Sequence, residues 1–91
     1  MIKIEIVHNQ SANYLIRDLC TQSDIVGYST MAVDSACGPN WRVIDSDPTD
    51  PHYYTFILAE SSNANTLLKR LKTDLAETTE LMIWTSEIQL I

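Results

Sequence analysis

The chain is poor in basic residues, in cysteine and in long apolar runs, and each shortage excludes a class of protein. Six Lys and Arg residues stand against twelve Asp and Glu residues, which gives a formal net charge of −6. Proteins that bind nucleic acids or anionic membranes need clustered basic side chains, so we expect no nucleic-acid partner and no direct lipid binding. No stretch approaches the roughly 20 apolar residues that a transmembrane helix needs.

The two cysteines are too few for the disulfide framework of a small secreted domain. Cys20 falls in an apolar helical pattern and Cys37 in a loop, which is typical of reduced thiols in a cytosolic protein. Strand-like sequence follows Met1 directly, without the apolar core of a secretory signal. Both features favour a cytoplasmic location.

What is present is typical of one small globular domain, residues 1–91. Hydrophobic residues make up 45% of the chain and charged residues 20%. A chain of this size buries only about 60–65% of its unfolded surface, so we expect modest stability as a monomer.

Hydrophobic periodicity predicts four main strands and two helices. Ile2, Ile4 and Ile6 alternate with residues of the other face, as in a strand with one buried side. Apolar residues at i, i+3, i+4 and i+7 mark two amphipathic helices, each preceded by a serine suited to capping. The predicted elements are a strand over 2–7, a helix from Ser11 to about residue 24, strands over 27–33 and 52–59, a helix from Ser61 or Ser62 to about Glu77, a strand over 81–85, and 87–91 as its continuation or as a short extra strand.

This order predicts an α+β, ferredoxin-like βαββαβ sandwich, with an antiparallel sheet and both helices on one face. The uncovered face would then carry several large apolar side chains, which is unusual for a small monomer. We therefore expect a homo-oligomer that pairs through this face. The residues assigned to the face are Val7, Tyr53 or Tyr54, Met82 or Trp84, and Ile91.

A long loop, residues 34–51, separates the second and third main strands. It holds all three prolines of the chain and exceeds the roughly 12–15 residues beyond which structureless loops are usually functional or disordered. Trp41 and Arg42 stand in this polar segment together with Asp45 and Asp47. A large aromatic residue here either folds back on the domain or anchors a partner, and both alternatives stay open.

The whole pattern resembles the PII-like signalling proteins. The resemblance rests on the strand Ile2–Val7, on Gly27-Tyr28-Ser29 opening a strand that leads into a long loop, and on the apolar strand 53–60 followed by a helix and a terminal strand ending Ser86-Glu87-Ile88-Gln89-Leu90. It covers essentially the whole chain.

The resemblance implies a non-enzymatic homotrimer whose sheets line a central core. Segment 34–51 would correspond to the T-loop, which contacts a partner protein, and a membrane transporter is one candidate for that partner. Ligand clefts would lie between subunits, with an adenine nucleotide as a candidate ligand. The residues implied in the cleft are Gly27, Tyr28 and Ser29, the loop base from Val33 to Gly38, and Arg42.

The chain departs from the family where nucleotide phosphates are usually held. Residues 76–80 contain no glycine and no basic residue, whereas the family pattern has a Gly-rich, basic segment there. Glu77 and Glu80 would repel a triphosphate. The resemblance is therefore to a divergent member that lacks the usual basic phosphate-binding segment.

Two other interpretations stay open, a metal-binding trimer of the CutA-like type and an oligomeric scaffold without a ligand. The loop offers oxygen ligands for a hard cation, or Cys37 and His52 for zinc. Its acidic residues are equally suited to turns. A Cys37–His52 nucleophile pair has no accompanying motif, so we do not expect an enzyme. The oxygen ligands are Asp45, Asp47 and Asp50.

Overall fold

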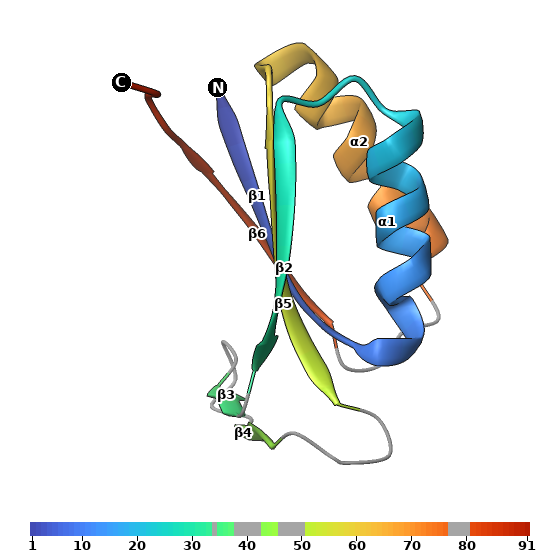
Figure 1. Cartoon of the computed structure of the whole chain (residues 1–91). Helices are drawn as coiled ribbons and strands as arrows, with labels where there is room; N and C mark the ends of the chain where they lie inside the picture. Colours follow the sequence, from blue (N-terminus) through green and yellow to red (C-terminus); the bar gives the residue numbers. More distant parts are fainter. Residues whose placement is uncertain (34, 38–42, 46–50, 77–80) are drawn as a thin grey trace.

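The computed structural model describes residues 1–33, 35–37, 43–45, 51–76 and 81–91, without the side chains of 35–37 and 43–45. Four strands form one antiparallel sheet in the order β2-β5-β1-β6, and both helices lie on the same face of it (Figure 1). This confirms the predicted ferredoxin-like arrangement. The elements are β1 (Ile2–Asn9), a 3-10 turn η1 (Gln10–Ala12), α1 (Asn13–Gln22), β2 (Gly27–Val33), β3 (Ser35–Cys37), β4 (Val43–Asp45), β5 (His52–Ala59), α2 (Ser61–Asp74) and β6 (Met82–Glu87).

The core lies between the sheet and the helix layer. Ile4 and Ile57 pair across β1 and β5, and neither side chain is exposed. The apolar stripes of α1 and α2 close over them, as the helical spacing predicted. The helix residues of this core are Ile16, Leu19 and Cys20 in α1, and Ala64, Leu67 and Leu71 in α2, with Leu75 just beyond it.

Several boundaries differ from the prediction. β1 continues through His8 to Asn9. His8 is buried like Ile4 and Ile6, so it continues the alternation of buried residues along the strand. Ser11 lies inside the 3-10 turn and caps neither η1 nor α1 with its side chain. The backbone N–H of Gln10 donates to the carbonyl oxygen of Pro51 at 2.9 Å, which ties the turn to the start of β5.

The ends of α2 and β6 also differ from the prediction. Helix α2 ends at Asp74, about three residues earlier than expected, and Glu60 occupies its N-cap position without a side-chain hydrogen bond. Strand β6 runs to Glu87, and residues 88–91 form neither a continued nor an extra strand. The N–H of Ile88 instead donates to the carbonyl oxygen of Met1 at 3.0 Å.

The long loop is not wholly irregular. Strands β3 and β4 pair as an antiparallel two-stranded sheet, with Ala36 opposite Ile44. Figure 1 shows this pair beyond the end of β2 and β5, away from the helix layer. Its short ladder supplies backbone hydrogen bonds within a segment that was expected to lack strands.

The second face of the main sheet has no helix over it (Figure 1). Strand alternation places Val7, Tyr54, Met82 and Trp84 on this open face, and Tyr53 on the helix side. Val7 is only 5% exposed, since Tyr54 and Met82 flank it from the neighbouring strands. In the described part of the chain, no helix has the length and apolar character to cross a membrane.

Candidate functional site

The β2 edge carries the described residues of the expected ligand cleft. Within the described residues β2 pairs only with β5, so its other edge is unpaired. Every residue from Tyr28 to Ala32 is exposed. Gly27 and Val33 stand at opposite ends of the strand, about 20 Å apart at the usual strand rise, so one subunit does not gather them into a pocket. Gly38 and Arg42 lie outside the described residues.

Gly27 has open space around it. A Cβ atom built on this residue meets nothing within 4 Å, and its backbone is not in the left-handed region. Within the described residues, neither packing nor backbone conformation requires glycine at this position.

A chain of hydrogen bonds connects the buried core to the β2 edge. Nδ1 of His8 lies 3.0 Å from the carbonyl oxygen of Asn9, and Nε2 lies 2.7 Å from Oγ1 of Thr55. Thr55 Oγ1 in turn lies 2.8 Å from Oγ1 of Thr30 on β2. His8 and Thr55 are fully buried, whereas Thr30 is exposed.

The imidazole of His8 is held in its neutral form. Burial lowers its pKa, and the nearby His52 acts in the same direction, while the hydrogen bond to the Asn9 carbonyl opposes them. The ring also stacks against Tyr53 at a centroid distance of 6.1 Å. This network was not predicted from the sequence, because polar residues such as His8 and Thr55 are typical of a solvent-exposed strand face.

A second polar cluster lies on the open face. Tyr54 donates a hydrogen bond to Oε1 of Glu5 at 2.6 Å, and Nζ of Lys3 lies 3.5 Å from the same oxygen. Nζ of Lys3 also lies 5.1 Å from the centre of the Phe56 ring, within cation–π range. The ring of Trp84 lies 6.5 Å from that of Tyr54. The cluster combines one ion pair with three aromatic rings on the sheet face that neither α1 nor α2 covers.

The cluster holds Glu5 ionised. The hydrogen bond from Tyr54 lowers the pKa of Glu5, and Lys3 and the indole of Trp84 add to this effect against partial burial. Partial burial raises the pKa of Tyr54, and the bond to Glu5 raises it further. Partial burial works to lower the pKa of Lys3, but Tyr54 and Glu5 raise it overall. A general acid or base needs a pKa near the working pH, so this cluster is suited to binding rather than to proton transfer.

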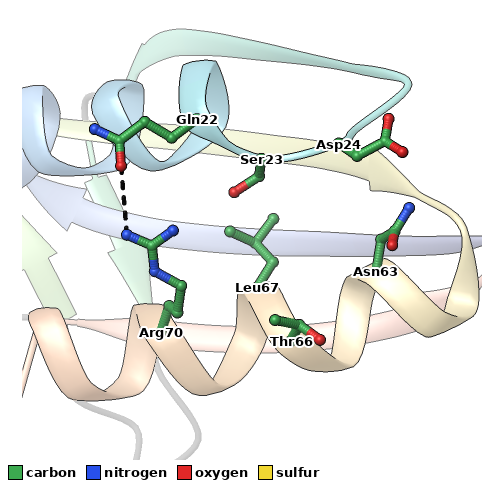
Figure 2. A pocket seen from close by; sticks show the side chains of 7 residues that line it. All are labelled: Gln22, Ser23, Asp24, Asn63, Thr66, Leu67 and Arg70. Atoms are coloured by element: carbon green, nitrogen blue, oxygen red, sulfur yellow. Dashed lines mark hydrogen bonds between the residues drawn. The ribbon is translucent and has the colours of Figure 1, made fainter.

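A small cavity of about 190 Å³ lies between the end of α1 and one face of α2 (Figure 2). Oε1 of Gln22 accepts a long hydrogen bond of 3.4 Å from Nη2 of Arg70 at its rim. The cavity contains none of the residues expected in the ligand cleft. The residues that line it are Gln22, Ser23, Asp24, Asn63, Thr66, Leu67 and Arg70.

The alternative metal site is not assembled by the described residues. Among them, no group of three His, Cys, Asp or Glu residues is arranged to hold a metal ion. Cys37 pairs with Val43, and Asp45 with Ser35, so the two candidate ligands stand at opposite ends of the β3–β4 ladder. His52 is buried at the start of β5. The remaining candidates, Asp47 and Asp50, lie outside the described residues, as does Trp41 of the expected partner-binding loop.

Comparison with known proteins gives matches in structure alone. No protein-family model matches the chain, and no curated protein matches it in sequence. A structure of CPII, a nitrogen regulatory PII-like protein from Thiomonas intermedia bound to ADP, AMP and bicarbonate, superposes with a TM-score of 0.80 at 15% identity, over 98% of this chain and 86% of that one.

Two further structures have the same fold. A putative PII-like signalling protein from Thermus thermophilus matches with a TM-score of 0.74 at 14% identity, over 99% of this chain and 88% of that one. A DUF3240 family protein from Shewanella baltica matches with a TM-score of 0.67 at 11% identity, over 99% of this chain and 92% of that one. The fold of this chain is therefore a divergent PII-like fold, which confirms the resemblance at the level of structure.

Proposed function

We propose that this chain is a non-enzymatic regulatory protein of the PII-like kind that acts as a homotrimer. In this proposal an adenine nucleotide binds between subunits along the β2 edge, and segment 34–51 contacts a partner protein. The observation that carries the proposal is the likeness, over 98% of this chain, to a PII-like protein bound to ADP, AMP and bicarbonate. Sequence identity of 15% shows a shared fold and not a shared function, so nucleotide binding needs separate support.

The β2 edge supports a site that a second subunit completes. Tyr28 and Ser29 are exposed, and Gly27 has room on its Cα for an approaching group. An unpaired strand edge offers backbone donors and acceptors that a ligand or a neighbouring chain can use. In this proposal the neighbouring subunit supplies the other wall of the site.

The open face supports assembly. Trp84 is 43% exposed and Met31 is 49% exposed, and both lie on the side without helices. Large apolar groups on an uncovered sheet face are typical of a protein–protein interface. The same contact would enlarge the core of a chain that is small for independent stability.

The acidic residues at 77 and 80 favour a nucleotide with fewer phosphates. Each additional phosphate adds negative charge near Glu77 and Glu80, and residues 76–80 contain no Lys or Arg to balance it. We therefore expect AMP or ADP to bind more tightly than ATP. This preference distinguishes the proposal from a nucleotide site built on a basic phosphate-binding segment.

A thermal-shift screen tests the proposal. The purified protein is melted with AMP, ADP and ATP, and in parallel with Zn²⁺ and Mg²⁺. A ligand that binds the folded state raises the melting temperature in proportion to its saturation. Stabilisation by AMP or ADP, reduced by Gly27→Ala, supports the proposal. Stabilisation by Zn²⁺ alone, lost in His52→Gln, supports the metal-binding alternative and contradicts the nucleotide site.

A further inference from the structure

The hydrogen-bond chain from His8 to Thr30 has one consistent arrangement of its protons. A backbone carbonyl only accepts hydrogen bonds, so the 3.0 Å contact with the Asn9 oxygen places the proton of the neutral ring on Nδ1 of His8. Nε2 is then a bare acceptor, and the hydroxyl of Thr55 at 2.7 Å must donate to it.

The direction of the last bond follows. Thr55 has a single hydroxyl proton, which its bond to His8 already uses. The oxygens of Thr55 and Thr30 are 2.8 Å apart, so Thr30 is the donor in this bond. The hydroxyl proton of Thr30 thus points toward Thr55. Only the lone pairs of the Thr30 oxygen remain available to a ligand.

We propose that the His8–Thr55–Thr30 chain fixes the polarity of the β2 edge, so that Thr30 offers an acceptor and no donor to a bound ligand. The edge then selects a ligand group that carries a hydrogen-bond donor, such as an amine, and rejects a carbonyl or phosphoryl oxygen at this position. The inference rests on the proposed binding along β2, and it names the chemistry that Thr30 recognises there.

Selectivity of this kind depends on a rigid hydroxyl. An ordinary exposed threonine rotates its hydroxyl and serves as donor or acceptor as required. Thr30 loses that choice, because turning its proton outward would leave two oxygens 2.8 Å apart without a proton between them. Burial of His8 and Thr55 excludes water that would otherwise replace the lost bond.

Among adenine-type ligands, the 6-amino group is the donor that suits Thr30. Inosine monophosphate provides a probe, because at position 6 it carries a carbonyl oxygen in place of the amino group of AMP, together with a proton on N1 that AMP lacks. We expect AMP to bind at least about tenfold more tightly than IMP, since two facing acceptors leave a polar group without a partner.

Nuclear magnetic resonance of the free protein tests the chain directly. Long-range ¹H–¹⁵N correlation at pH 7 distinguishes the two tautomers of a histidine, and His52→Gln assigns the signals because the chain has only two histidines. The proposal predicts protonated Nδ1 and unprotonated Nε2 in His8. Thr55→Val should shift the Nε2 resonance. A protonated Nε2 at pH 7 would overturn the proposal whatever the protein binds.

Calorimetric titration with AMP and IMP tests the recognition. Thr30→Val should bring the two dissociation constants to within about threefold of each other. The control Thr85→Val, on the helix side of β6 at the opposite edge of the sheet, should keep the preference for AMP. Equal affinities in the wild type would overturn the recognition by Thr30. If neither nucleotide binds while His8 has the predicted tautomer, the nucleotide proposal fails and the fixed polarity of the edge stands.

Discussion

Tyr54 donates a hydrogen bond to Glu5 across the β5–β1 pair, with 2.6 Å between the oxygens, on the sheet face that neither helix covers. Nζ of Lys3 lies 3.5 Å from the same oxygen of Glu5. All three residues belong to one chain, so the carboxylate keeps these partners whatever packs against this face. An ionised carboxylate is costly to bury unless it is paired and hydrogen-bonded, and this cluster meets that condition within the single chain.

The first prediction concerns this pair. Tyr54→Phe removes the donor and should raise the pKa of Glu5 toward its usual value, because the hydrogen bond from Tyr54 is the largest influence that lowers it. Carboxyl titration by NMR measures the change. Thr85→Val, on the helix side of β6, is a control and should leave the Glu5 titration unchanged. An unaltered Glu5 pKa in Tyr54→Phe would show that the bond is not formed in solution.

The second prediction concerns the stability of the protein at mildly acidic pH. Burial lowers the pKa of His8, so the unfolded chain takes up this proton more readily than the folded one. Stability should thus be constant above the ordinary histidine pKa of about 6.5 and decrease as the pH falls below it. The free energy of unfolding in urea, measured at pH 7.5 and pH 5.5 and at one protein concentration, checks the slope.

His8→Gln removes that titrating group and should flatten the decrease between pH 7.5 and pH 5.5. The lowered pKa of Glu5 affects stability only at more acidic pH, since its contribution is retained above the ordinary glutamate value and lost as the pH falls through the folded-state pKa. A wild-type protein equally stable at pH 7.5 and pH 5.5 would contradict a buried, neutral His8.

The third prediction concerns Thr55, the middle member of the buried chain. Thr55→Val keeps the shape of the side chain but leaves Nε2 of His8 without its donor. We expect a loss of about 1–3 kcal/mol in unfolding free energy, the range for a buried polar group without a partner. Thr85→Val on the exposed strand β6 should change stability by less than about 0.5 kcal/mol. Equal effects of the two substitutions would contradict the buried network.

The fourth prediction concerns Cys20. The side chain is 3% exposed, and burial raises its pKa to about 11, so the reactive thiolate is scarce at neutral pH. In a Cys37→Ser background, the folded protein should react with iodoacetamide at pH 7.5 at least about a hundredfold more slowly than the same protein in 6 M guanidinium chloride. Similar rates in the two conditions would show that the α1 core opens readily.

The sequence predicted the parts of the fold that rest on apolar periodicity. Ile2, Ile4 and Ile6 alternate as expected, and Leu67 and Leu71 mark the buried stripe of α2. Where polar residues enter the buried rows, the pattern no longer distinguishes core from surface. His8 was therefore predicted to end β1, although its hydrogen bond to Thr55 satisfies it inside the core.

The candidate site was less accessible to sequence reasoning. Gly27, Tyr28 and Ser29 do lie on an exposed strand edge, but the pairing of Thr55 with Thr30 depends on strand register, which alternation alone does not give. The β3–β4 pair was missed because strands of three residues show too few periods to detect. The proposed ligand site is shared between subunits, and the sequence of one chain does not show how a second copy would complete it.

Native mass spectrometry of the protein with ADP tests the central claim most directly, because one spectrum reports both assembly and binding. The proposed function predicts a species of about 31 kDa, three times the 10.3 kDa chain, that carries up to three ADP molecules. Trp84→Glu, which places a charge on the open face, should shift this species toward the single chain. A wild-type protein that remains a single chain, or a trimer that retains no ADP at millimolar concentration, would contradict the proposed function.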